Sequence, residues 1–161
     1  MLRRLWLLAM TPVFWIVPSI FFLDRIVKLI IVNRYAEGGG FAVLPGVFHV
    51  TRVNNKGAAF GMLKNYGNVL IVVSVACVIF LGFYLVRKAS SSGDGLIKFA
   101  WSLVLAGALG NLYDRLRYGY VVDYLDFRVW PVFNVADASI CVGAGLAAIY
   151  FLNKSGVPKG S

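Results

Sequence analysis

The residues best suited to chemistry in this sequence are its carboxylates. The chain has seven acidic residues, and five of them fall in or beside long apolar segments: Asp24, Asp114, Asp123, Asp126 and Asp137. A carboxylate close to a lipid bilayer is costly unless it is paired, hydrated or protonated, so each one indicates a candidate functional site. Two carboxylates in one partly dry site share a proton, so that one can accept a proton from water while the other donates to a carbonyl. This is the chemistry of an aspartyl peptidase, and it requires neither a metal nor a nucleophilic side chain.

The pair that the sequence favours for this chemistry is Asp123 and Asp137. On a membrane helix that starts near Phe133, Asp137 lies about 6 Å along the axis and therefore just below the outer surface. Asp123 lies in the loop that bounds the same surface. A structural alternative exists, because Asn134 and Asp137 have the spacing of a helix N-cap and its third residue, so both side chains could simply cap the helix.

The other aspartates also have structural interpretations. Asp24 and Lys28 are four residues apart on one helix face, a spacing that favours mutual neutralisation. Asp114 stands beside Arg115, and the two could form a structural ion pair. Asp126 lies three residues after Asp123 in a segment that can be hydrated, which favours a solvated surface charge.

Few other polar residues could carry chemistry. Asn55 and Gly57 belong to a turn of small residues, where backbone capping is an alternative to a role in a site. His49 has the pattern of a residue on a strand surface. One histidine with two separated cysteines, Cys77 and Cys141, cannot complete a zinc site without several carboxylates, so neither a metal nor another cofactor is expected.

The composition indicates a membrane protein. Of the 161 residues, 60% are hydrophobic and 14% are charged, whereas roughly a quarter are charged in an ordinary soluble domain. The formal charge of +9 comes from Lys and Arg that are scattered between apolar blocks, with no basic run. We therefore expect anionic lipid, and not nucleic acid, as the counter-charge.

Four apolar blocks are long enough to cross a bilayer as helices. We expect spans at 12–32, 67–86, 97–115 and 133–152, all within one integral membrane domain that covers residues 1–161. Glycines in the third and fourth spans, at 107, 110 and 143, favour close helix approach. The fold class is therefore a mainly helical membrane protein with four transmembrane helices.

A small extramembrane β-sheet is predicted between the first two spans, at residues 38–62. Two β-branched and aromatic stretches there are joined across Pro45-Gly46, which is typical of two strands and a turn. With both termini in the cytoplasm, the inner segments 1–4, 87–98 and 153–161 hold seven Lys and Arg in 25 residues, and the outer segments hold six in 50. The positive-inside rule therefore favours cytoplasmic termini and an outer sheet.

Five motifs occur in order along the chain, at residues 24–28, 55–60, 107–115, 119–127 and 133–139. Together they closely resemble the lipoprotein signal peptidase family, also called signal peptidase II. The resemblance implies a bacterial cytoplasmic (inner) membrane protease with four helices and an outer β-cradle. It implies an aspartyl endopeptidase that removes the signal peptide from diacylglyceryl-modified prolipoproteins, just before the lipidated cysteine. Its partners would be these substrates and membrane lipids, and it would act as a monomer near the outer face.

By motif, the resemblance places the catalytic pair on Asp123 and Asp137. It implies that these residues surround or support the site: Asn55, Gly57, Gly107, Asn111, Asp114, Arg115, Asn134, Ala136, Asp24 and Lys28. One departure is Arg25, because the family usually has glutamine after this aspartate.

Two other classes of function remain open on the residues alone. In a small proton-coupled carrier, Asp24, Asp123 and Asp137 would form a proton relay. A non-catalytic membrane scaffold would tolerate the loss of either carboxylate of the pair. The extramembrane sheet and the absence of an internal repeat count against the carrier.

Overall fold

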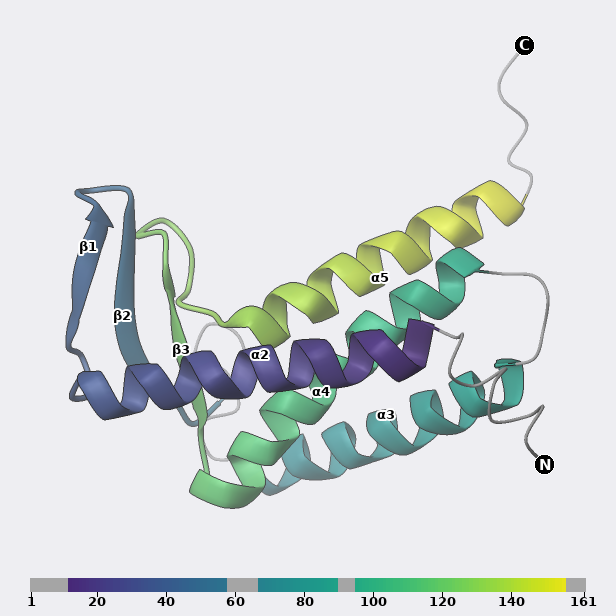
Figure 1. Ribbon diagram of the computed structural model, residues 1–161, viewed down its shortest axis with the longest axis horizontal. Helices are drawn as coiled ribbons and strands as arrows, with labels where there is room; N and C mark the ends of the chain where they lie inside the picture. The colour runs from purple at the N-terminus through teal and green to yellow at the C-terminus, as the bar shows by residue number, and fades with distance from the viewer. Residues whose placement is uncertain (1–11, 58–66, 90–94, 156–161) are drawn as a thin grey trace, which may run out of the picture.

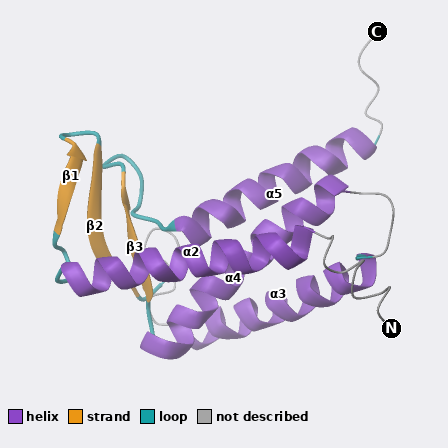
Figure 2. Cartoon of the chain, in the orientation of Figure 1, coloured by secondary structure: helices purple, strands orange, loops and turns teal. Residues whose placement is uncertain are grey.

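In the part of the chain that the computed structural model describes, four helices lie side by side and a small sheet crosses one end of them (Figures 1 and 2). The structure describes residues 12–57, 67–89 and 95–155. The elements in chain order are α2 (Pro12–Arg34), β1 (Gly40–Leu44), β2 (Phe48–Asn55), α3 (Gly67–Lys88), α4 (Gly95–Tyr118), β3 (Val121–Asp126) and α5 (Val135–Lys154). The helices alternate in direction, so that α2 begins and α5 ends away from the sheet.

Three of the four predicted spans match helices that are long and apolar enough to cross a membrane. Within the described residues these are Asn68–Lys88 of α3, α4 and α5. The helices end a few residues beyond the predicted limits, as α4 does at Tyr118, and α5 begins later than predicted, at Val135. Helix α2 has 23 residues, but charged residues at positions 24, 25 and 28 interrupt its apolar stretch. The prediction of a fourth span is therefore not confirmed.

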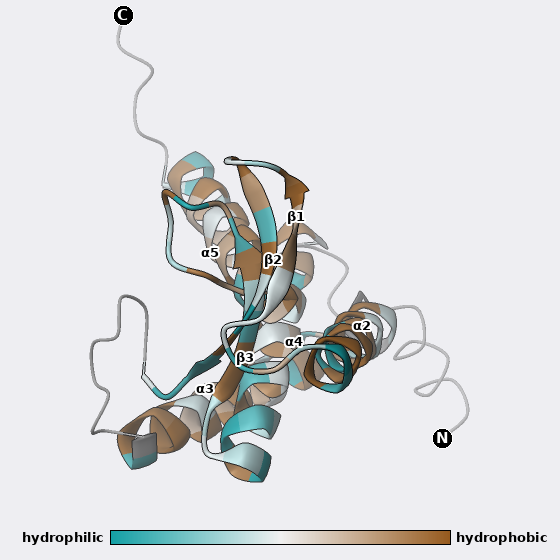
Figure 3. Ribbon diagram, turned by 90° about the vertical axis from the view of Figure 1, so that its left-hand side faces the viewer, coloured by the Kyte–Doolittle hydropathy of each residue, from teal (hydrophilic) through white to brown (hydrophobic). Residues whose placement is uncertain are grey.

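Helix α4 is the centre of the bundle. It packs against α2, α3 and α5, and 72% of its apolar stretch is buried, against 11% for α3. The outward side chains of α3 are large and apolar, including Val72, Phe80 and Val86, and the ribbon of α3 is correspondingly brown in Figure 3. A surface of this kind suits lipid better than water.

Small residues bring α4 and α5 close together, as predicted. A Cβ atom on Gly107 would meet the carbonyl oxygen of Ala136 and lie 2.6 Å from the Ser139 hydroxyl oxygen. A Cβ atom on Gly143 would lie 2.5 Å from the carbonyl oxygen of Ala100. Helix backbones can approach this closely only where side chains are absent, and the contact holds the first turn of α5 against α4.

The sheet is antiparallel in the order β1-β2-β3. The predicted hairpin is confirmed, with its turn at Gly46, whose φ of 77° suits glycine. Residues 58–62 of the predicted β segment lie outside the described residues. The segment that holds Asp123, which the sequence predicts to be a loop, forms strand β3. Nearly every residue of Val121–Asp126 is buried, so the strand lacks the alternation that identifies a half-exposed strand.

Candidate functional site

The two predicted catalytic carboxylates come from different elements and line the same cavity. Asp123 lies on β3, and Asp137 lies in the first turn of α5. The cavity has a volume of about 690 Å³. Its polar wall includes both carboxylates with Asn55 and Arg115, and its apolar wall is formed by Trp130, Pro131, Val132, Phe133, Ile140 and Cys141.

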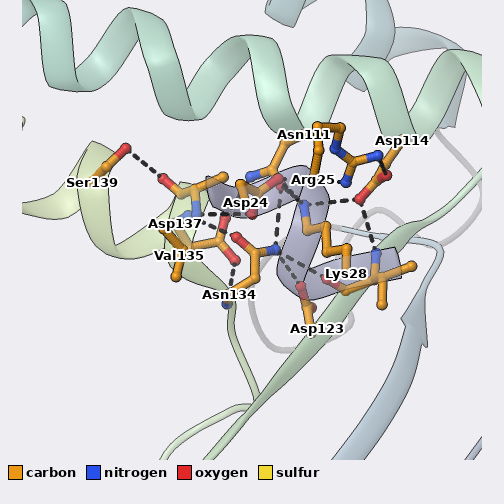
Figure 4. A network of polar contacts seen from close by, with 12 residues as sticks. Asp24, Arg25, Lys28, Asn111, Asp114, Asp123, Asn134, Val135, Asp137 and Ser139 are labelled. Atoms are coloured by element: carbon orange, nitrogen blue, oxygen red, sulfur yellow. Dashed lines mark hydrogen bonds and ion pairs between the residues drawn. The ribbon is translucent and has the colours of Figure 1, made fainter. Parts of the chain in front are cut away.

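Asn134 contacts both carboxylates (Figure 4). Its side-chain nitrogen donates to Asp123 Oδ1 at 2.6 Å. Its side-chain oxygen accepts from the backbone N–H of Asp137 at 2.8 Å, and its own backbone N–H donates to Asp137 Oδ2 at 3.3 Å. The last two bonds form a capping box, so the predicted cap is confirmed. The same cap places Asp137 beside Asp123.

Two further amides complete the polar surroundings of the pair. Asn55 donates to Asp123 Oδ2 at 2.9 Å, and its oxygen accepts from the backbone N–H of Gly57 at 2.9 Å. Asn111 on α4 donates to Asp137 Oδ1 at 2.6 Å. Each carboxylate oxygen therefore accepts a hydrogen bond, and the capping role predicted for Asn55 coexists with its contact to Asp123.

The electrostatic environment of Asp123 favours the protonated acid. Burial raises the pKa of Asp123 to about 7, and the negative charge of Asp137 contributes to the increase. The hydrogen bonds from Asn55 and Asn134 act in the opposite direction. None of the ion pairs among the described residues involves Asp123 or Asp137. A carboxyl group with this pKa exchanges its proton near neutral pH.

Beside the pair lies an ion cluster, which we define as Asp24, Arg25, Lys28 and Asp114. Lys28 Nζ lies 2.9 Å from Asp24 Oδ2 and 2.8 Å from Asp114 Oδ2. Arg25 lies 2.6 Å from Asp114 Oδ1 and 3.4 Å from Asp24 Oδ2. All four residues are buried. The predicted pair of Asp24 and Lys28 is confirmed, but it is part of a larger cluster.

The ion cluster also holds the backbone beside each member of the pair. Asp24 Oδ1 accepts from the N–H of Ala136, which precedes Asp137, at 3.2 Å. Asp114 Oδ2 accepts from the N–H of Val122, which precedes Asp123, at 3.2 Å. The structure therefore brings the predicted supporting residues into one connected region, where Gly107 provides the close packing described above.

Two structural interpretations from the sequence are wrong. Asp114 pairs with Arg25 and Lys28, and not with its neighbour Arg115, which lines the cavity instead. Asp126 is not a solvated surface charge, because it is only 5% exposed. It accepts from the Thr51 hydroxyl at 2.9 Å and from the Arg128 N–H at 2.9 Å. Both errors follow from elements that pack side chains distant in sequence against these aspartates.

Neither the role of Arg25 nor the apolar cavity wall is predicted from the sequence. Arg25 directly follows Asp24, and neighbouring residues on a helix do not share a face. The dipeptide Trp130-Pro131, between a strand and a helix, was the available signal for the wall. Among the described residues, no three His, Cys, Asp or Glu side chains are grouped in a way that could hold a metal ion.

Comparison with known proteins identifies relatives over most of the chain. Residues 16–153 match the family model described as signal peptidase (SPase) II. A lipoprotein signal peptidase of Halothermothrix orenii is 43% identical over 138 residues, which cover 86% of this chain and 93% of the relative. One from Clostridioides difficile is 42% identical over 134 residues, covering 81% of this chain and 87% of the relative.

Solved structures show the same architecture. A bacterial membrane enzyme determined by the in meso method at 2.3 Å resolution superposes with a TM-score of 0.81 at 30% identity, covering 92% of both chains. A second bacterial membrane enzyme, determined at 1.9 Å resolution, gives a TM-score of 0.75 at 31% identity, covering 87% of this chain and 92% of the other.

Proposed function

The chain belongs to the signal peptidase II family, and on that premise we propose that it cleaves diacylglyceryl-modified prolipoproteins by aspartyl chemistry, just before the lipidated cysteine. Family membership makes it a peptidase of a bacterial membrane that removes signal peptides from prolipoproteins. The observation that carries the aspartyl assignment is that Asp123 and Asp137 line one cavity while Asn134 contacts both.

In this mechanism, the two carboxyl groups share one proton. The ionised carboxylate accepts a proton from a water molecule, and the water oxygen attacks the scissile carbonyl carbon. The protonated partner donates to the carbonyl oxygen. When the carbon–nitrogen bond breaks, the carboxyl group that took the proton from water donates it to the leaving amine, and the hydroxyl group formed from the carbonyl oxygen returns its proton to the other carboxylate. The amides of Asn55, Asn111 and Asn134 hold the carboxylates in place. These steps use the pair and water, so the proposed reaction is independent of metal.

We assign the sheet end of the molecule to the outer face of the bacterial inner membrane. Helices α3 and α5 end with Arg87, Lys88 and Lys154 away from the sheet, which the positive-inside rule places in the cytoplasm. Helix α2 then forms a fourth span. The ion pairs of Asp24, Arg25 and Lys28 support this assignment, because paired charges are tolerated inside a bundle.

The lipid on the substrate has a positioning role in this proposal. An acyl-anchored cysteine holds the scissile bond at the membrane surface, which is the depth of the cavity at the sheet end of the helices. The apolar wall around Trp130 and Ile140 lies beside the carboxylates. We expect an unlipidated precursor to be cut poorly, and equal cleavage of both forms would contradict this positioning role. All the proposed site residues come from one chain, so we expect a monomer to be active.

The test is cleavage of a diacylglyceryl-modified prolipoprotein by the purified protein in detergent or lipid, followed by gel shift. Wild type is expected to cleave, and neither Asp123→Asn nor Asp137→Asn is expected to do so. Glu37→Gln removes an exposed carboxylate outside the cavity and is the matched control. Full activity in Asp137→Asn would overturn the mechanism, since an amide cannot act as the base.

The same preparation distinguishes the two other classes of function. A proton-coupled carrier would give proton-dependent flux in liposomes, and the proposed peptidase gives none. A scaffold would show no cleavage with wild type. Failure of folded wild type to cleave the lipidated precursor would reject the peptidase assignment.

A further inference from the structure

Arg25 is the charged residue of the ion cluster that the proposed chemistry leaves unexplained. It is 8% exposed, and its guanidinium lies between two carboxylates, 2.6 Å from Asp114 Oδ1 and 3.4 Å from Asp24 Oδ2. The inference below rests on the proposed function, because it concerns how this cluster supports the reactive pair.

Lys28 uses all three of its ammonium donors within the described residues. Two reach the carboxylates of Asp24 and Asp114, and the third reaches Asn111 Oδ1 at 3.1 Å. The oxygen of the Asn111 amide accepts from Lys28 and also from the side-chain NH₂ group of Asn134 at 3.2 Å, so the NH₂ group of Asn111 faces Asp137 and donates to it at 2.6 Å. The orientation of the donor to Asp137 thus depends on Lys28 together with Asn134.

Two carboxylates and a single cation would leave this buried cluster with an excess negative charge. Such an imbalance is costly away from water, and it draws the only cation more closely between the carboxylates. Arg25 supplies the second positive charge, so the four side chains are neutral together. With the charge balanced, the Lys28 ammonium can contact both carboxylates and still reach Asn111.

We propose that Arg25 is a positioning residue for the reaction, which balances Asp24 and Asp114 so that Lys28 can orient the Asn111 amide toward Asp137. The balanced carboxylates also keep their bonds to the backbone N–H groups of Ala136 and Val122, which precede the two reactive aspartates. Arg25 therefore acts through the ion cluster and not through contact with substrate.

The contribution of Arg25 is mainly its charge. Arg25 Nε and Asp114 Oδ1 are both buried without a hydrogen-bond partner among the described residues, although the two side chains form a close ion pair. The guanidinium carbon lies 4.7 Å from the centroid of the Tyr113 ring, which favours a cation there. A lysine at position 25 can supply the same charge, whereas glutamine cannot.

The experiment compares cleavage kinetics of wild type, Arg25→Gln and Arg25→Lys on the lipidated precursor, with thermal unfolding in detergent measured alongside. We expect Arg25→Gln to lower kcat by about tenfold, because the donor to Asp137 is displaced. KM is expected to stay within about twofold of wild type, since Arg25 does not contact substrate. Arg25→Lys is expected to restore most of kcat. Arg34→Gln, which removes an exposed cation from the end of the same helix, is the control and is expected to match wild type.

Several outcomes would overturn the proposal. These are an unchanged kcat in Arg25→Gln, a change confined to KM, or an Arg25→Lys variant as slow as Arg25→Gln. If Arg25→Gln is not recovered in folded form, the charge-balanced double variant Arg25→Gln with Asp114→Asn decides. A folded and active double variant is the expected result, and a double variant no better than the single one overturns the proposal. Absence of cleavage by wild type in the same assay would instead reject the proposed function.

Discussion

Two pairs of carboxylates lie in one hydrogen-bonded network, and the groups that surround the two pairs differ. Asp24 and Asp114 each contact the cations Arg25 and Lys28 at 3.4 Å or less. Asp123 and Asp137 line a cavity and form no ion pair among the described residues, and amide groups hold them instead. Asp24 and Asp114 lie on α2 and α4, whereas Asp123 lies on β3 and Asp137 lies in the first turn of α5.

The difference separates carboxylates that hold the structure from carboxylates that can react. A contacting cation compensates the charge of a buried carboxylate and fixes its position, so Asp24 and Asp114 can hold neighbouring segments in place. Amide donors fix the geometry of a carboxylate without adding a full charge, so burial can raise its pKa, as it does for Asp123. Each pair therefore has an environment that matches the role proposed for it.

The strongest test of this comparison replaces one carboxylate oxygen with an amide NH₂ group in each pair. Asp137→Asn is expected to lower the cleavage rate on the order of a thousandfold or more, while the protein stays folded. Asp24→Asn leaves Lys28 and Arg25 buried with one carboxylate fewer, which is expected to cost about 3 kcal/mol of stability. Cleavage kinetics and chemical unfolding in detergent, measured on both variants, check the two outcomes. Loss of stability in Asp137→Asn with retained activity would reverse the assignment of the two pairs.

The next largest effect is expected at Asn134, which caps α5 and also donates to Asp123. Asn134→Ser keeps a side-chain oxygen that can cap the helix but loses the NH₂ donor. It is expected to lower kcat by about a hundredfold with little loss of stability. Asn134→Ala loses both functions and is expected to be about 1 kcal/mol less stable than the Ser variant. Equal kcat in the Ser variant and wild type would show that Asn134 only caps.

Much of this arrangement could be predicted from the sequence where the signal was local. Apolar length located α3, α4 and α5, and the Asn134–Asp137 spacing located the cap. The i,i+4 spacing identified Asp24 and Lys28 as a pair. The residues of the candidate site were predicted from ordered motifs, whose resemblance to a family implies the roles proposed for them.

The features that the sequence could not provide depend on contacts between distant segments. Strand β3 is buried on both faces, and its pattern does not differ from that of a buried loop until β2 is seen beside it. Asp126 is the last residue of the same strand. Its hydrogen-bond donor Thr51 lies on β2, 75 residues away in the sequence. The pairing of Asp114 with α2 likewise requires knowing that α2 and α4 are neighbours.

The pH dependence of stability tests the environment of Asp123, one of the two carboxylates proposed to react. Burial raises the pKa of Asp123 to about 7 in the folded protein, whereas an unfolded Asp titrates near pH 4. Between about pH 4 and about pH 7 the folded state therefore binds more protons than the unfolded state, and stability falls as pH rises through this window. We expect the unfolding midpoint of wild type to fall by roughly a few degrees between pH 5 and pH 8. Asp123→Asn should show a flatter profile.

Asp126→Asn is the control for this measurement, because the pKa of Asp126 is lowered whereas the pKa of Asp123 is raised. Burial acts to raise the pKa of Asp126, but hydrogen bonds from the Arg128 N–H and the Thr51 hydroxyl lower it overall. Its stabilising contribution is present above about pH 4 and is lost only as the pH falls below that value. The slope between pH 5 and pH 8 should therefore be unchanged in Asp126→Asn. If the slope of stability against pH were equally reduced in both variants, Asp123 would not be the cause of that slope.

The smallest expected effect concerns a bond that supports α5 without reaching either pair. The hydroxyl oxygen of Tyr124 accepts from the N–H of Val135 at 3.4 Å, at the first residue of α5. Burial raises the pKa of the Tyr124 hydroxyl, which therefore stays neutral near neutral pH. Tyr124→Phe leaves one helix N–H without this acceptor, which is expected to cost about 0.5–1 kcal/mol of stability.

The cleavage rate of Tyr124→Phe is expected to stay within about twofold of wild type. The reason is that Asp24 holds the N–H of Ala136 and Asn134 holds the N–H of Asp137, so the first turn of α5 keeps two shorter bonds when the long one is removed. Cleavage kinetics and chemical unfolding in detergent check both numbers. A tenfold loss of rate would mean that the placement of Asp137 is controlled from β3. The ion cluster would then only stabilise the fold. Tyr124 on β3 would be the residue that positions Asp137.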